Sequence, residues 1–69
     1  MKAVSGKRMC KALEGKGWLL KRIKGSHHIY AHASHLDTII SVPVHANRML
    51  KKGTQQGIMK DAGLTDADL

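Results

Sequence analysis

Hydrophobic residues near the start of the chain follow the period of an α-helix. Met9, Ala12 and Leu13 recur at positions i, i+3 and i+4, which places them on one side of a helix. Ser5 precedes this pattern and belongs to the residue types that cap helix N-termini well. Gly15 follows the pattern and is typical of a helix end. The pattern therefore predicts a first helix that begins after Ser5 and ends near Gly15.

After this helix the hydrophobic period changes to that of strands. Residues 18–24 and 27–32 form two short runs on either side of Gly25 and Ser26. A Gly-Ser pair between two such runs is typical of a β-hairpin with a type II′ turn, in which Gly25 supplies a positive φ angle. The sequence therefore predicts two antiparallel strands joined by a two-residue turn.

A third strand and a second helix are predicted in the rest of the chain. Residues 38–44 are rich in β-branched side chains, which favour strands. Pro43 has no N–H group for a sheet ladder, so the strand should end there or lie at a sheet edge. Thr54 is a candidate N-cap for the last helix, and Gly63 is a candidate for its C-terminal end.

The order of these elements is α-β-β-β-α, which predicts an α+β fold. The most economical arrangement packs both helices on one face of a three-stranded antiparallel sheet. A chain of 69 residues suffices for one small domain. We expect residues 1–69 to form it, with a core of about 5–64. Residues 65–69 are mostly polar and acidic, and we expect them to be a frayed tail.

Positive charge is concentrated in the first third of the chain. Residues 1–24 contain eight lysines and arginines and a single acidic residue, which accounts for the whole formal net charge of +7. Residues 25–69 hold four basic and four acidic residues. A one-sided basic surface favours a polyanionic partner, most often a nucleic acid and less often a membrane surface. A lysine-rich surface that only keeps the protein soluble is the alternative explanation.

The chain carries no sequence feature of a secreted or membrane protein. Its single cysteine cannot form an internal disulfide and suits a reducing compartment. No segment resembles a signal peptide or is long and apolar enough to span a bilayer. We therefore predict a soluble, cytoplasmic protein with no membrane partner.

Five histidines invite metal binding, acid–base chemistry or simple packing as explanations. His28 and His32 are four residues apart, which on a strand separates them by about 13 Å, too far to share one zinc ion. No second cysteine or carboxylate cluster completes a metal site, and the sequence contains no glycine-rich phosphate-binding motif. We therefore predict that the protein uses no metal and no cofactor.

Acid–base chemistry on RNA needs little more than this chain offers. RNA carries its own nucleophile, the 2′-hydroxyl, beside each phosphate. A base that removes the hydroxyl proton, with cations that stabilise the phosphorane charge, suffices for cleavage. One well-placed histidine among lysines meets this requirement. A histidine that is merely exposed or packed is the alternative, and the residue pattern leaves both open.

Three short motifs resemble, in their order and spacing, those of a known family. They are Gly-Ser-x-His at residues 25–28, Val-Pro-x-His at residues 42–45, and Gly-Thr at residues 53–54 ahead of Ala-Gly at residues 62–63. The stretch from about Ser5 to Leu64 is similar to the HicA-type (YcfA-like) mRNA interferase toxins of bacterial toxin–antitoxin modules.

This resemblance implies a fold like that of double-stranded-RNA-binding domains and metal-independent cleavage of mRNA. It implies that His28, the histidine of Gly-Ser-x-His, is the catalytic residue, and that a HicB-type antitoxin is the protein partner. It gives no role to His45, the histidine of Val-Pro-x-His. Many relatives carry an apolar residue and then a basic one after Gly-Thr, where this chain has Gln55 and Gln56.

Residues near the hairpin turn and near the start of the second helix are expected to contact the RNA backbone. The hairpin residues lie at an exposed tip, and the serine hydroxyl is able either to cap the turn or to bond a phosphate. A solvated role is the alternative for each lysine. The expected RNA-binding residues are Lys24, Gly25, Ser26, Lys51 and Lys52.

Two other functions fit the same residues. A non-catalytic double-stranded-RNA-binding module would use the lysines but need no histidine. A protein-interaction domain would show no affinity for RNA even at low salt, where phosphate contacts are strongest.

Overall fold

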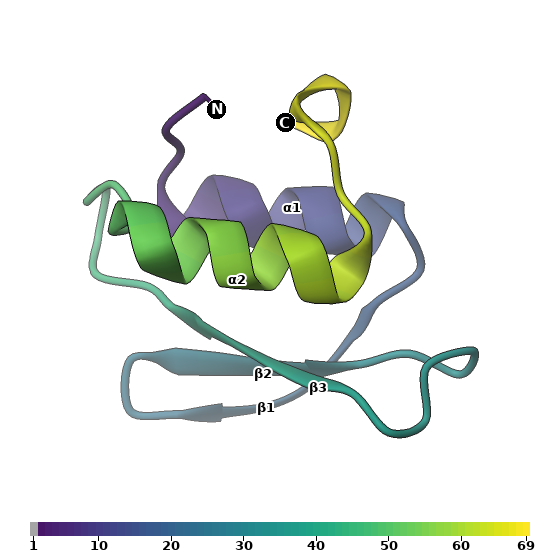
Figure 1. Cartoon of the computed structure of the whole chain (residues 1–69). Helices are drawn as coiled ribbons and strands as arrows, with labels where there is room; N and C mark the ends of the chain where they lie inside the picture. Colours follow the sequence, from purple (N-terminus) through teal and green to yellow (C-terminus); the bar gives the residue numbers. More distant parts are fainter. Residues whose placement is uncertain (1) are drawn as a thin grey trace.

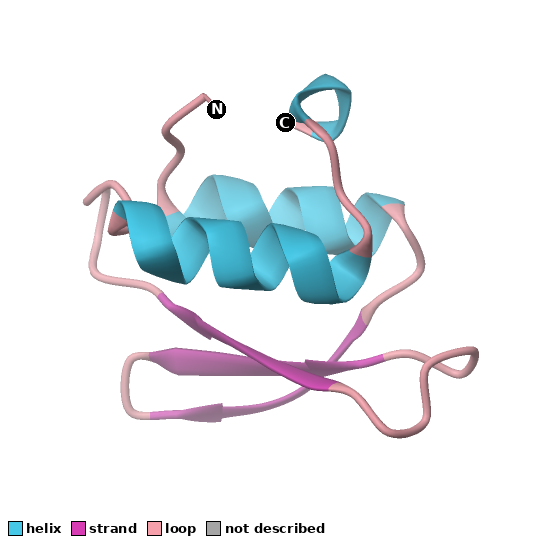
Figure 2. Ribbon diagram, in the orientation of Figure 1, coloured by secondary structure: helices cyan, strands magenta, loops and turns pink. Residues whose placement is uncertain are grey.

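The computed structural model describes residues 2–69 and confirms the predicted α-β-β-β-α order (Figure 1). The three strands form one antiparallel sheet in the order β1-β2-β3, and both helices lie side by side on one face of it (Figure 2). Within residues 2–69, neither helix is long and apolar enough to cross a membrane. The elements are α1 (Gly6–Gly15), β1 (Leu19–Lys24), β2 (His27–Ala31), β3 (Ile39–Pro43), α2 (Lys52–Ala62) and a short 3₁₀ helix, η1 (Asp66–Asp68).

Helix α1 begins and buries its apolar side as the sequence predicts. The Ser5 side chain accepts a hydrogen bond from the Arg8 N–H at 3.1 Å and so caps the first turn. Met9 and Leu13 are completely buried and pack in the core. Gly6 lies so close to β3 that a Cβ atom there would stand 2.1 Å from the carbonyl oxygen of Pro43. The N-terminus of α1 is therefore fixed against the end of β3.

The β1–β2 hairpin turns at Gly25 and Ser26, as predicted. Gly25 has a φ of +59°, and Lys24 and His27 form the closing pair. The register shifts at Lys21, where β1 carries one extra residue and forms a β-bulge. Strand β1 is therefore an irregular strand at the edge of the sheet.

The two helices cover β2 and β3 and leave β1 exposed. The β2 and β3 residues on the helix-facing side are buried or half-buried, whereas Leu20 and Ile23 of β1 are 44% and 56% exposed. Every residue of β1 is exposed. Two cross-strand rows face the helices: Leu20–Tyr30–Ile40 and Ile23–His28–Val42.

Helix α2 ends as predicted but begins earlier. Gly63 adopts the left-handed conformation with a φ of +67° and terminates the helix. The expected cap at Thr54 is wrong, because the helix begins at Lys52 with Lys51 in the N-cap position. The Gln55 N–H bonds to the Lys51 carbonyl at 2.9 Å, so the first turn closes on Lys51 and Thr54 lies inside it.

Gln55 is the one polar side chain in the described core, with no exposed surface. Its Oε1 accepts a hydrogen bond from the Val4 N–H at 3.1 Å, and its Nε2 donates to the Lys2 carbonyl. These bonds join α2 to the segment that precedes α1. Gln55 therefore connects α2 to a segment about fifty residues earlier in the chain.

Residues 65–69 differ from the expected frayed tail. They contain η1, and Leu69 packs in the core with 6% of its surface exposed. The Arg8 guanidinium donates to the Leu69 carbonyl, with an Nε–O distance of 2.8 Å. The apolar side chain of Leu69 and a basic residue of α1 thus hold a segment whose acidic composition suggested a solvated tail.

Asp68 adds an ionic contact to this docked segment. Its carboxylate accepts a hydrogen bond from the Thr65 N–H at 2.8 Å and lies 3.1 Å from the Lys16 ammonium. The Thr65 bond, and then the Lys16 contact, hold the pKa of Asp68 below its ordinary value of 3.8. The acidic tail therefore balances part of the basic charge at the C-terminal end of α1, where Lys16 is the C-cap residue.

Candidate functional site

His28 lies on β2, on the side of the sheet that faces the helices, and is half-buried. Its Nδ1 is 3.9 Å from the Sγ of Cys10, which projects from α1. Burial raises the pKa of the Cys10 thiol, so the thiol is protonated at neutral pH. Within residues 2–69, Nε2 of His28 has no hydrogen-bond partner. One nitrogen of the ring is therefore held by the protein, and the other is open to a ligand.

A series of polar side-chain contacts connects Cys10 to Tyr30 and Glu14. The Tyr30 hydroxyl donates to the Glu14 carboxylate at 2.6 Å, and the side chains of Tyr30 and Cys10 are also hydrogen-bonded. Burial raises the pKa of Tyr30 well above its usual range, so the phenol stays protonated. Cys10 is buried in the core, and its contact with His28 is not visible in the sequence.

The hairpin turn brings two of the three sequence motifs together. The Val44 N–H bonds to the Ser26 carbonyl at 2.7 Å, which extends the β2–β3 ladder to the turn. The residue after Val44, His45, has its Nε2 3.5 Å from the Ser26 Oγ. The serine of Gly-Ser-x-His and the histidine of Val-Pro-x-His are therefore neighbours, which spacing along the chain could not show.

A cavity of about 360 Å³ opens beside this contact, between the end of β3 and the start of α2. His45, Arg48 and Lys51 contribute basic groups to its wall, and none of its described lining residues is acidic. Pro43 and Leu50 add apolar surface. The cavity thus offers positive charge beside an apolar wall.

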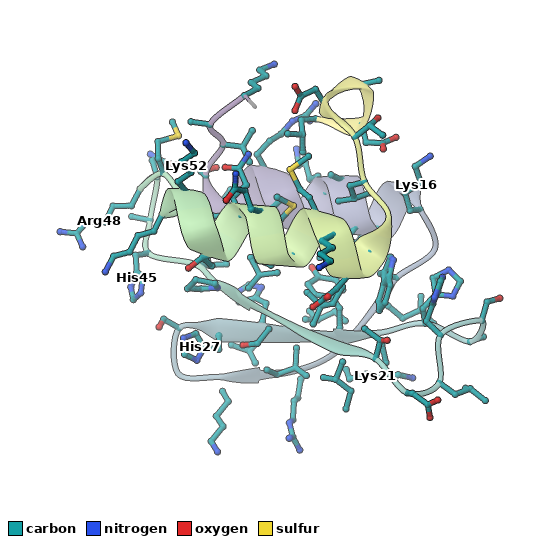
Figure 3. The ribbon with its side chains drawn as sticks, in the orientation of Figure 1. Lys16, Lys21, His27, His45, Arg48 and Lys52 are labelled. Carbon is teal, nitrogen blue, oxygen red and sulfur yellow. The ribbon has the colours of Figure 1, made fainter. Side chains whose placement is uncertain are left out.

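The predicted RNA-binding residues lie in two groups. Lys24, Gly25 and Ser26 are at the hairpin turn, whereas Lys51 lines the cavity and Lys52 is exposed at the first position of α2. Figure 3 shows that Lys52 of α2, His27 of β2, and His45 and Arg48 of the loop between β3 and α2 lie at the same end of the molecule. Both groups were predicted from their places at the turn and near the helix start, whereas Arg48 was missed because it lies in the loop between β3 and α2.

The other histidines have different surroundings. His27 is exposed on the helix-free face of the sheet, opposite in direction to His28. His32 bonds through Nε2 to the Lys16 carbonyl at 3.0 Å, and its Nδ1 accepts from the Ser34 N–H at 2.9 Å. Its ring also packs edge-on against Trp18. Within residues 2–69, no cluster of three or more His, Cys, Asp or Glu side chains is suited to hold a metal ion.

Comparison with known proteins identifies the family. Residues 6–64 match the family model described as the HicA toxin of bacterial toxin–antitoxin systems. A comparison with curated protein sequences gave no significant match. The family match covers α1, the whole sheet and α2, and it includes His28, Ser26 and the residues that line the cavity. The chain therefore belongs to the HicA toxin family of bacterial toxin–antitoxin modules.

Proposed function

We propose that this protein is a metal-independent endoribonuclease that cleaves mRNA and blocks translation, with His28 as its acid–base residue. The observation that carries the proposal is the open Nε2 of His28 in a chain of this toxin family. The histidine is half-buried and held at Nδ1, which fixes the direction of the ring. RNA as the substrate places the reaction in the cytoplasm.

The reaction starts with proton transfer from a 2′-hydroxyl to Nε2 of His28. The 2′-oxygen attacks the adjacent phosphorus, the bond to the 5′-oxygen breaks, and the products carry a 2′,3′-cyclic phosphate and a 5′-hydroxyl. For Nε2 to accept a proton, the neutral ring must carry its hydrogen on Nδ1. In that tautomer Nδ1–H points to the Cys10 sulfur, 3.9 Å away. A protonated thiol is a compatible neighbour, since it adds no competing charge.

The RNA strand is proposed to cross the end of the molecule that carries the hairpin turn. Lys24 and Ser26, with the Gly25 backbone between them, contact the strand on one side, and Lys51 and Lys52 contact phosphates on the other. All five residues lie at this end of the molecule. Binding through lysine–phosphate pairs releases counterions, so the affinity for RNA is expected to fall steeply with salt.

We infer that a HicB-type antitoxin binds this toxin through a partly acidic surface. The basic charge of β1 supports this, because Lys21, Arg22 and Lys24 lie on the same exposed strand as three apolar residues. Leu20 and Ile23 present apolar surface beside that charge. An acidic partner with apolar contact residues complements both features.

The test compares His28→Ala with His27→Ala on a long mRNA in the presence of EDTA. The two histidines are adjacent, but only His28 faces Cys10 and the helices. Wild type and His27→Ala are expected to cleave and His28→Ala is not, while circular dichroism shows that all three are folded. Equal cleavage by all three would mean that another residue or a contaminant carries the activity. RNA binding without cleavage by any of them would instead indicate a non-catalytic RNA-binding module.

A further inference from the structure

Acid–base cleavage by His28 leaves one step without a residue. The 5′-oxygen departs as an alkoxide unless a second group gives it a proton. The Val-Pro-x-His motif and the cavity beside it have no role in the proposed reaction so far. We propose that His45 is a second catalytic residue that protonates the leaving 5′-oxygen, while the cavity holds the nucleotide that carries this oxygen. This inference rests on the proposed endoribonuclease function.

Ser26 connects His45 to the strand that carries His28. The His45 Nε2 is 3.5 Å from the Ser26 Oγ, and Ser26 precedes His28 by two residues. Ser26 lies in the turn, and two residues of chain span at most about 7 Å. The bond between the Val44 N–H and the Ser26 carbonyl, at 2.7 Å, fixes this arrangement.

The two histidines also reach this region from different directions. His28 projects from β2 toward the helices, whereas His45 lies in the segment between β3 and α2. In phosphoryl transfer the attacking and leaving oxygens lie roughly in line with phosphorus, so an acid and a base must approach from two sides. A phosphate held beside Ser26 meets that condition, with His28 toward the 2′-oxygen and His45 toward the 5′-oxygen.

His45 is available for this chemistry, whereas His32 is not. The His45 side chain is exposed, and its one hydrogen-bond contact within residues 2–69 is the long one to Ser26. By contrast, both ring nitrogens of His32 are bonded to backbone groups, and its ring packs on Trp18. The surroundings of His32 indicate a structural role, and those of His45 indicate a ring that is open to substrate.

The cavity fits a nucleotide in size and in chemistry. Its volume of about 360 Å³ is within the range of small-ligand sites, which is roughly 300 to 1,000 Å³. Arg48 and Lys51 supply positive charge for a phosphate, and Pro43 and Leu50 supply apolar surface for a base. His45 forms part of the same wall, so a nucleotide bound there brings its 5′-oxygen to the imidazole.

The proton balance closes with two histidines. His28 enters neutral and leaves with the 2′-hydroxyl proton, and His45 enters as imidazolium and leaves neutral. The P–O2′ bond forms as the P–O5′ bond breaks. Exchange with water restores both rings, and no oxidant, metal or cofactor takes part.

The test uses an oligoribonucleotide that contains one mapped cleavage linkage, in an oxygen form and in a form with sulfur at the 5′-bridging position. A thiolate leaves without a proton, so a variant that lacks only the acid should recover on the sulfur substrate. We expect His45→Gln to slow cleavage of the oxygen substrate by about 100- to 10,000-fold and that of the sulfur substrate by less than tenfold. In His45→Gln the basic limb of the pH–rate profile for the oxygen substrate should also disappear.

Two controls make the outcome specific. His28→Ala should slow both substrates, because it removes the base. Arg48→Gln should raise KM for both substrates equally, because it removes a phosphate contact and no proton donor. Equal slowing of both substrates by His45→Gln would overturn the acid role, as would wild-type rates on both. Failure of the wild type to cleave the oxygen substrate would instead overturn the proposed function itself.

Discussion

The buried amide of Gln55 makes a testable contribution to stability. It accepts a hydrogen bond from the Val4 N–H and donates one to the Lys2 carbonyl. Replacing Gln55 by Met keeps a long, flexible side chain of similar helix propensity but removes these two bonds and the weak Nε2 contact with the Met59 sulfur, 3.8 Å away. The neighbouring Gln56 is exposed on the same helix, so Gln56→Met is a matched control.

The two lost bonds differ in cost. Val4 is buried, so its N–H is left without a partner, and an unsatisfied buried donor costs about 1 to 3 kcal/mol. Lys2 is exposed, so water replaces the bond to its carbonyl at little cost. We therefore expect Gln55→Met to lower the free energy of unfolding by about 2 kcal/mol, which corresponds to a fall in Tm of about 8 to 16 °C for a domain of this size. Gln56→Met should change it by less than about 0.5 kcal/mol.

Thermal and urea unfolding followed by circular dichroism measure both values. Hydrogen exchange at the Val4 amide adds a local readout, because loss of the Gln55 bond should speed exchange there before the sheet is affected. Equal Tm values for Gln55→Met and Gln56→Met would refute the reasoning. Gln55 would then contribute by filling space, and its hydrogen bonds would be energetically neutral.

Further predictions concern the helix–sheet contact, the tail and the partner surface. Gly6→Ala should destabilise the protein by about 1 to 3 kcal/mol or prevent folding, because its Cβ would collide with the β3 backbone. Gly57 has open space around it, so Gly57→Ala should stabilise α2 by up to about 1 kcal/mol. Urea unfolding measures both effects. The folded-state pKa of Asp68 lies below its ordinary value, so the stabilisation by the tail contact is fully present above about pH 4 and is lost as the pH falls through the folded-state pKa. An NMR pH titration should show this loss, and Asp68→Asn should abolish the pH dependence. Leu20→Asp should weaken antitoxin binding at least about tenfold in calorimetry, whereas Leu36→Asp, 86% exposed in a loop, should leave it unchanged.

The features that the sequence predicts best are those that depend on local chemistry. The Ser5 cap, the turn at Gly25 and the helix end at Gly63 each follow from the backbone needs of a few neighbouring residues. The predicted start of α2 was wrong because local chemistry favours Thr54 as the cap, whereas the helix begins at Lys52 and Lys51 makes no side-chain cap bond. The first turn instead carries Gln55, whose side chain is buried in the core.

The features that the sequence missed depend on contacts between distant segments. The docking of Leu69 depends on Arg8, sixty-one residues away, so composition alone suggested a solvated tail. In the candidate site, His28 was assigned through a short motif. Its contact with Cys10 and the cavity beside His45 arise from how the helices and loops lie on the sheet, and hydrophobic periodicity carries no information on either.

The irregular edge strand has a consequence for how the molecule behaves at high concentration. An open strand edge is a template that a second chain can extend, and exposed apolar residues make such growth more favourable. In β1, the bulge at Lys21 interrupts the regular spacing of backbone donors and acceptors. Two copies that paired there would also bring like charges from Lys21, Arg22 and Lys24 together. The strand is thus protected against fibril-like self-assembly while it keeps its apolar surface open to a partner of opposite charge.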